Sequence, residues 1–245
     1  MKRLTVIPVL GLLAAGAAIA QPLVVDLSDH RVAITTGFSG AEVLAFGAID
    51  EPGEVVLVVH GPLRPVTMHR KARIAGIWIN TASMTFDQAP SFYAVASSRP
   101  LDEIASPSVL ARNQIGIENL RLELPRAKAS PNVAKAWRDA LIRTHQNIDL
   151  YGSEVARIGF LGSRLFSTRV RFPANVPTGT YRATTYLFVD GRVESAQTTP
   201  LIISKAGLEA DIFDFAHQQG ALYGAIAILV ALMAGWLAHI AFRKA

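Results

Sequence analysis

Residues 178–199 read TGTYRATTYLFVDGRVESAQTT and carry the strongest fold signal in the chain. The segment from Tyr181 to Val189 is rich in Thr, Tyr, Phe and Val, residue types that favour β-strands. Asp190-Gly191 is a typical two-residue type I′ turn, and residues 192–199 have the length of a returning strand. These residues therefore predict a β-hairpin.

The run from Thr178 to Tyr181 directly precedes the first strand of this hairpin. It resembles the tyrosine corner of immunoglobulin-like sandwiches, in which a tyrosine hydroxyl binds the backbone of the preceding loop. Ala183 stands where antibody domains have a cysteine, so the sequence supports the general sandwich and not a true antibody domain. In the alternative interpretation, Tyr181 is an ordinary core residue of the strand.

The rest of the body also consists of short β-segments. We predict strands over 31–35, 42–49, 55–60, 74–80, 83–86, 92–97 and 165–172. The turn residues at 50–53 predict that the second and third of these strands form a hairpin. Short strands at this spacing indicate a mainly β protein with an immunoglobulin-like β-sandwich rather than a parallel sheet.

One helix is expected to interrupt the strands, over residues 131–151. Ser130 can cap this helix, and Pro131 suits its first turn. Trp137 and Leu141 are four residues apart and share its apolar face. We expect the helix to be inserted between two β halves and to lie on the sandwich.

Both ends of the chain are apolar. Residues 1–20 combine a basic start, an apolar run and an Ala-x-Ala site, which is the pattern of a cleaved signal peptide. Residues 221–242 carry no formally charged side chain and would span about 33 Å as a helix, enough to cross a bilayer. Alternative interpretations are an uncleaved N-terminal anchor and a buried C-terminal core helix.

These two segments predict a single-pass protein of the inner membrane. Residues 21–205 would form a periplasmic domain, and residues 206–220 would form a juxtamembrane segment. Residues 243–245 include two basic side chains and are expected to remain in the cytoplasm as a short stub.

Small residues recur at offsets of three and four along the expected span, at Gly220, Gly224, Ala227, Ala231 and Gly235. Such a stripe lets a second helix approach closely, so it predicts packing against an integral-membrane partner. The alternative is the ordinary Ala and Gly content of a membrane helix.

The formal net charge of +5 comes mostly from the ends of the chain. Four of the 24 basic residues lie in the signal and in the tail, so the body keeps 20 basic residues against 19 acidic ones. A nearly neutral body removes the general argument for a nucleic-acid partner.

Basic residues nevertheless gather in two stretches that contain no acidic residue, 55–86 and 155–189. Arginine and hydroxyl donors suit the oxygens of sulfonyl or phosphoryl groups. The candidate anion-binding or docking residues are Arg70, Lys71, Arg73, Arg99, Arg169 and Arg171. In the alternative interpretation these residues lie on solvated strand faces, and Trp78 is the centre of a core with arginines at the strand ends.

The sequence offers little sign of catalytic chemistry. It contains no cysteine, no nucleotide-binding glycine motif and no hydrolase or zinc-protease motif. His60, Met68, His69 and Met84 are ligand types that copper prefers, but their spacing favours surface or core roles. We therefore predict no catalytic residue, no metal site, no cofactor and no enzymatic activity.

Several segments taken in order resemble the alphaproteobacterial transmembrane protein family Alph_Pro_TM. They are residues 70–80, 90–95, 173–181, 190–191 and three short motifs within 213–237. The family has no assigned molecular function, and the resemblance implies an association with permeases similar to TauE/SafE sulfite or sulfonate exporters. We therefore expect an accessory or interaction subunit of a membrane transporter. The alternative is a periplasmic receptor for small oxyanions.

Overall fold

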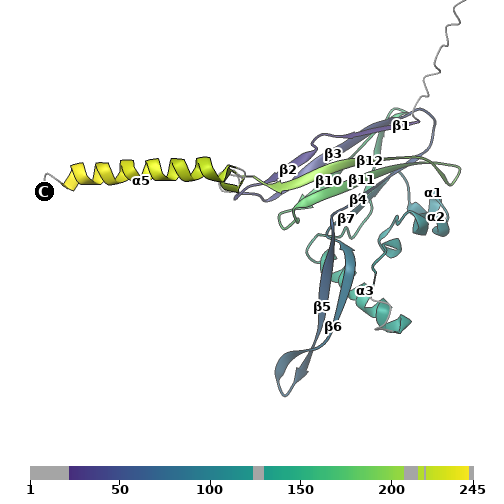
Figure 1. Ribbon diagram of the computed structural model, residues 1–245. Coiled ribbons are helices and arrows are strands. Elements are labelled where there is room, and N and C mark those ends of the chain that lie inside the picture. The colour runs from purple at the N-terminus through teal and green to yellow at the C-terminus, as the bar shows by residue number, and fades with distance from the viewer. Residues whose placement is uncertain (1–21, 124–129, 207–214, 218, 243–245) are drawn as a thin grey trace, which may run out of the picture.

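The computed structural model describes residues 22–123, 130–206, 215–217 and 219–242. These residues form a β-sandwich, a projecting β-hairpin, short helices and one long C-terminal helix (Figure 1). The sandwich has a four-stranded sheet in the order β1-β3-β10-β9 and a six-stranded sheet in the order β2-β12-β11-β4-β7-β8. The strands are β1 Leu23–Leu27, β2 Arg31–Ile34, β3 Gly40–Ile49, β4 Glu54–His60, β7 Tyr93–Ser97, β8 Ala156–Arg157, β9 Gly159–Leu161, β10 Leu165–Pro173, β11 Gly179–Val189 and β12 Arg192–Lys205.

The strand order confirms the mainly β, immunoglobulin-like fold. The four-stranded sheet corresponds to the ABED sheet of an immunoglobulin domain, and β12-β11-β4-β7 corresponds to the GFC sheet with one added strand. At the edge of the larger sheet, β2 pairs with β12 in parallel. All other pairs between long strands of the sandwich are antiparallel.

The core lies between the two sheets. Along β10, alternate side chains from Phe166 to Phe172 are buried and those between them are exposed. The face that carries Phe166 and Phe172 is therefore the one that packs in the core. The ring centroid of Phe172 lies 4.9 Å from that of Phe92 and 5.7 Å from that of Tyr181. Because Tyr181 belongs to the six-stranded sheet, these aromatic contacts join the two layers.

The β11–β12 hairpin forms as predicted. Asp190 and Gly191 have φ angles of 49° and 77°, and a type I′ turn requires positive φ at both positions. Tyr181, near the start of β11, donates its hydroxyl to the carbonyl oxygen of Pro177 at 2.6 Å. This bond confirms the tyrosine corner. The side chain is also fully buried, so Tyr181 is a core residue as well.

The predicted hairpin over 42–49 and 55–60 is wrong. In the structure β3 pairs with β1 and β10, whereas β4 pairs with β11 and β7 in the other sheet. The turn at 50–53 therefore crosses between the two layers. Turn residues predict that the chain reverses, but they do not decide whether the flanking strands bond to each other. The better signal was the uninterrupted apolar run from Val55 to Val59, which is typical of a strand buried on both faces and is buried throughout in β4.

A long hairpin of β5 (Leu63–Ile74) and β6 (Ile77–Pro90) projects from the sandwich between β4 and β7 (Figure 1). The strands predicted over 74–80 and 83–86 are parts of this hairpin, since β6 is continuous and Ile74 belongs to β5. Ala75 and Gly76 form its two-residue turn, with φ angles of 48° and 85°. The alternative interpretation, in which Trp78 is the centre of a core, is wrong, because this side chain is 65% exposed at the end of the hairpin.

The main helix, α3, spans Pro131–Gln146 and is shorter than the predicted range 131–151. The chain then turns through Asp149, whose φ of 58° does not continue a right-handed helix. Trp137 and Leu141 are buried in one cluster with Met84, Phe86 and Ala89 of β6. The helix therefore packs on the hairpin through Trp137 and Leu141, while Ile142 in its C-terminal half packs against the main core of the sandwich. Between β7 and α3 lie α1 (Leu101–Ile104), α2 (Pro107–Arg112) and a 3₁₀ turn (Ile117–Asn119).

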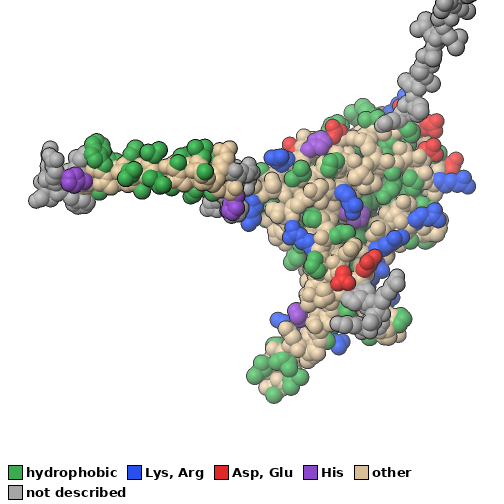
Figure 2. Space-filling model, in the orientation of Figure 1, with side chains coloured by type: hydrophobic (Ala, Val, Ile, Leu, Met, Phe, Trp, Pro, Cys, Tyr) green, Lys and Arg blue, Asp and Glu red, His purple; other side chains and the backbone are tan. Residues whose placement is uncertain are grey.

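The C-terminal helix α5 spans Gly220–Phe242, in agreement with the expected span over 221–242. Residues Gly220–His239 are long and apolar enough to cross a membrane, and the rest of the molecule buries none of them. Figure 2 shows hydrophobic side chains along this helix, away from the sandwich. The predicted signal peptide over 1–20, most of the juxtamembrane segment over 206–220 and the stub over 243–245 lie outside the described residues.

Candidate functional site

The six candidate basic residues lie on three separate parts of the fold. Three are on β5 near the end of the hairpin, two are on β10, and one follows β7: in that order Arg70, Lys71 and Arg73, then Arg169 and Arg171, then Arg99. The structure brings the members of each group together but does not bring the three groups into one site.

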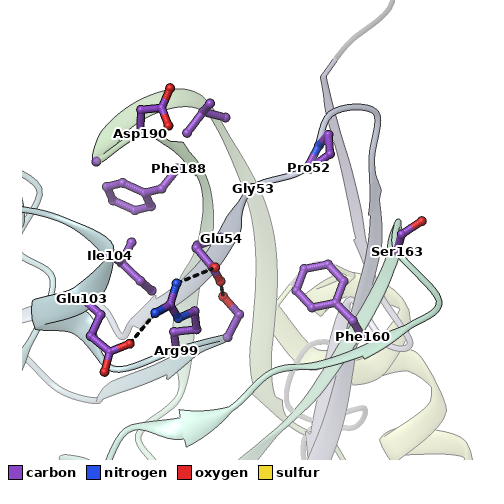
Figure 3. A pocket seen from close by; sticks show the side chains of 13 residues that line it. Pro52, Gly53, Glu54, Arg99, Glu103, Ile104, Phe160, Ser163, Phe188 and Asp190 are labelled. Carbon is purple, nitrogen blue, oxygen red and sulfur yellow. Dashed lines mark hydrogen bonds and ion pairs between the residues drawn. The ribbon is translucent and has the colours of Figure 1, made fainter.

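Arg99 lies in a pocket of about 640 Å³ beside the start of β4 and the β11–β12 turn (Figure 3). Its guanidinium contacts Glu103 at 2.6 Å and Glu54 at 3.5 Å. The hydrogen bond and charge of Glu103, followed by those of Glu54, raise the pKa of Arg99. Asp190 also lines this pocket, so carboxylates outnumber the guanidinium. Such a pocket is unfavourable for an oxyanion.

Arg169 and Arg171 are exposed on the outer face of β10. In the register of the sheet, Arg171 lies opposite Glu42 of β3, and opposite charges in such a pair attract. Arg171 and Glu42 also line a shallow pocket together with Asp149. This pair of arginines therefore lies on a solvated strand face that already holds acidic neighbours.

The hairpin tip, which we define as residues 71–80, has an aliphatic face. The register pairs Ile74 with Ile77 and Ala72 with Ile79, so these four side chains share one side of the hairpin. Ile77 is 67% exposed, and Ile74 and Ile79 are also exposed. Figure 2 shows this hydrophobic cluster at the free end of the projection. In a water-soluble setting, such a patch marks a surface that contacts another molecule.

The other face of the hairpin tip is cationic and aromatic. Arg73 lies opposite Trp78, and Lys71 lies opposite Asn80. Arg73 also donates to the carbonyl oxygen of Gly76 in the turn. Closer to the sandwich, the guanidinium of Arg70 lies 5.8 Å from the ring of Trp137, which is a cation–π distance. Arg73 and Arg70 are thus each placed next to a tryptophan, and Lys71 next to an amide side chain.

A third, polar pocket of about 350 Å³ lies at the root of the hairpin. His60 ends β4 there, and its Nε2 is buried with no hydrogen-bond partner among the described residues. Burial, and secondarily the charge of Arg182, lower the pKa of His60 from 6.5 to about 4, so the ring is neutral at pH 7. Arg121, Arg182 and Glu123 line the same pocket.

The root pocket was not predicted, because His60, Arg121 and Arg182 come from distant parts of the sequence. The available signal was a histidine at the end of an otherwise apolar strand, and that pattern is too common to indicate a site. Likewise, the alternative interpretation placed Trp78 in a core, since an aromatic residue among isoleucines is typical of one.

The described residues contain no group of three or more His, Asp or Glu side chains placed to hold a metal ion. Met68 and Met84 face each other across the hairpin and pack in the cluster beneath α3. His69 lies opposite Ser83 in the next register position. The methionines therefore have a packing role in this structure.

The small residues of α5 are open to a neighbour. At 100° per residue, Gly224, Ala227, Ala231 and Gly235 fall on one side of the helix. A Cβ added at Gly220, Gly224 or Gly235 would meet no atom within 4 Å. Nothing among the described residues covers this side of α5.

Comparison with known proteins agrees with this anchored architecture. A search of curated proteins finds no match to the chain. Residues 22–244 match the family described as "Putative transmembrane protein" (Alph_Pro_TM), a match that runs from the strands of the sandwich through α5. The chain therefore belongs to this family of transmembrane proteins.

Proposed function

We propose that the protein is a non-enzymatic, single-pass inner-membrane protein that serves as an accessory or interaction subunit of a membrane transporter. The observation that carries this proposal is α5. Residues Gly220–His239 are long and apolar enough to cross a bilayer, and the sandwich buries none of them. An apolar helix of this kind is stable in lipid or against another apolar helix, and not in water.

The proposal places the sandwich in the periplasm. Residues 1–20 have the pattern of a signal peptide, and Arg243 and Lys244 directly follow the span. A green fluorescent protein fused after Ala245 should fluoresce in the cytoplasm. Protease added to spheroplasts should digest the sandwich and spare the fusion. Protection of the sandwich together with digestion of the fusion would reverse this topology.

The small-residue side of α5 is the proposed contact with the integral-membrane partner. A leucine in place of Ala227 or Ala231 would keep the two helices apart. Ala225 lies about 160° around the helix from Ala227, so Ala225→Leu is a matched control. From the family resemblance, we propose an exporter of small sulfur oxyanions, similar to TauE/SafE proteins, as the partner.

The test is co-purification of the tagged full-length protein in a mild detergent after crosslinking in cells. The wild type and Ala225→Leu should retain a membrane-protein partner, and Ala227→Leu combined with Ala231→Leu should lose most of it. Recovery of the wild-type protein alone, with no crosslinked membrane partner, would refute the accessory role.

A second candidate function is a periplasmic receptor for small oxyanions, and the root pocket is the observation that favours it. There the neutral His60 ring could donate from its unpartnered Nε2, while Arg182 and Arg121 supply positive charge. Calorimetry of the full-length protein with sulfite, sulfate, taurine and phosphate tests this function. Arg182→Gln should weaken binding at least tenfold, and Arg99→Gln, outside the root pocket, should keep the affinity within twofold of the wild type. The absence of heat with all four compounds would exclude this function.

A further inference from the structure

The hairpin tip protrudes from the molecule and does not form a groove. In β5 and β6, the residues nearest the sandwich are covered by α3, whose Trp137 and Leu141 pack on Met84 and Phe86. Beyond the cation–π contact of Arg70 with Trp137, no described element covers residues 71–80. A two-stranded ribbon is only marginally stable in water by itself, so an exposed apolar end needs another environment.

The hairpin leaves the sandwich at the end from which the chain continues to α5. In the six-stranded sheet, His60 at the end of β4 lies opposite Arg182, which in turn lies opposite Pro200 of β12. Beyond Pro200, β12 runs on in the same direction to its last residue, Lys205, from which the chain continues towards α5. The root is fixed there, since Arg64 donates to the carbonyl oxygen of Thr178 at 2.6 Å. The hairpin is therefore rooted at the end of the sandwich that is tethered to the membrane helix.

The side chains of the tip match the layers of a lipid interface. Ile74 and Ile77 flank the turn at the far end, Trp78 follows directly, and Arg73 and Lys71 lie behind them. Tryptophan is enriched at the membrane–water boundary, and lysine and arginine attract anionic headgroups. The only acidic residue of the hairpin is Asp87, which lies near the root on β6, so no negative charge at the tip opposes that attraction.

We propose that the hairpin tip inserts into the outer interface of the bilayer that holds α5, and that it prefers bilayers with anionic lipids. Ile74, Ile77 and Trp78 enter the headgroup–acyl boundary, and Lys71 and Arg73 contact lipid phosphates. The sandwich is then held at the membrane by two separate attachments, α5 and the tip. The inference uses α5 as a membrane span and does not depend on a transporter partner.

The absence of cysteine from the chain makes a direct test possible. Full-length protein carrying Ile77→Cys is labelled with an environment-sensitive nitrobenzoxadiazole dye and reconstituted in nanodiscs. One set of nanodiscs contains phosphatidylcholine, and the other contains 30% phosphatidylglycerol. The matched control is Val24→Cys, which is 55% exposed on β1 near Ala48, at the opposite end of the sandwich from the hairpin root.

The expected result is a blue-shifted emission at residue 77 that doxyl-labelled lipids quench, at least threefold more strongly with phosphatidylglycerol than without it. The label at residue 24 should report water in both lipids. Lys71→Ser combined with Arg73→Ser should remove the preference for phosphatidylglycerol. Because all these positions are exposed, the melting temperature should stay within 2 °C of the wild type in a parallel measurement.

Two outcomes would overturn the proposal. A label at residue 77 that reports water in both nanodiscs excludes insertion. A label at residue 77 that reports an apolar environment in native membranes but water in lipid nanodiscs would show that the tip contacts a protein and not lipid. Neither outcome affects the accessory role, since that role is tested separately through α5 and co-purification.

Discussion

The hydroxyl of Tyr181 donates a hydrogen bond of 2.6 Å to the carbonyl oxygen of Pro177, four residues earlier. The ring of Tyr181 meanwhile packs edge-on against Phe172 of the opposite sheet. One side chain therefore fixes the loop over 173–178 and joins the two layers of the sandwich. The same loop supports the hairpin root, because Arg64 bonds to Thr178.

Tyr181→Phe should keep the packing and remove the hydrogen bond. Since the carbonyl of Pro177 would lose its partner, we expect the free energy of unfolding to fall by about 1–2 kcal/mol. Chemical denaturation of the full-length protein in detergent measures this change. Tyr223→Phe, on exposed α5, is the control and should have no effect. An unchanged stability of Tyr181→Phe would show that the tyrosine corner is not a stabilising contact here.

Leu141→Ala should weaken the attachment of α3 to the hairpin. Leu141 is fully buried in the cluster with Met84 and Phe86, and such truncations cost about 2–5 kcal/mol. This cluster is separate from the main core, so hydrogen exchange should rise mainly over 63–90 and 131–146. Val133→Ala, at a 45% exposed position of the same helix, should change exchange little. A uniform rise across the sandwich would contradict the separation of the two clusters.

The sequence allowed individual strands, turns and helices to be predicted better than the elements against which they pair or pack. The type I′ turn at Asp190-Gly191, the tyrosine corner and the long apolar C-terminal helix each depend on neighbouring residues, and all three appear as expected. The pairing of β3 with β10 and the seat of α3 on β6 depend on contacts between distant residues. A turn signal at 50–53 is compatible with either a hairpin or a crossover, so local chemistry could not decide between them.

The candidate site, too, was predictable where it depends on neighbouring residues and not where it depends on contacts between distant ones. The basic stretch over residues 70–73 was recognisable, but its exposure was not, because an Ile-Trp-Ile strand has the composition of a core. Arg99 seemed available for an anion, yet Glu103, four residues later, binds it at 2.6 Å, and Glu54, from a strand more than forty residues earlier, adds a second carboxylate at 3.5 Å. The root pocket combines His60, Arg121 and Arg182 from three segments, and no local pattern could indicate it.

Gly191→Ala and Gly76→Ala introduce the same strain at two different turns. Both glycines have positive φ, 77° and 85°, where a Cβ costs about 1–2 kcal/mol. At Gly191 the strain should appear in full in the free energy of unfolding, because the β11–β12 hairpin belongs to the core sheet. At Gly76 the hairpin tip can open locally, so global stability should fall less while exchange over 71–80 increases. Equal losses in global stability would show that the tip folds and unfolds with the sandwich.

The pH dependence of stability should report on His60. In the folded protein, burial and the charge of Arg182 lower its pKa to about 4, whereas in the unfolded chain the value is 6.5. Between these two values the unfolded state binds more protons, so lowering the pH through this window favours unfolding. The stabilising contribution is complete above pH 6.5 and is lost by about pH 4, a change of about 3 kcal/mol.

His60→Gln should remove that part of the pH dependence, measured as the free energy of unfolding of the full-length protein at intervals from pH 7 to pH 4. Burial also lowers the pKa of His145, so protonation of this residue likewise favours unfolding, and His145→Gln should remove a further part of the pH dependence. His69→Gln, at an exposed position on the hairpin, is the control. If wild type and His60→Gln lose stability in parallel between pH 6.5 and pH 4, His60 does not remain neutral in the root pocket. The neutral ring then could not serve as the proposed donor to a bound oxyanion.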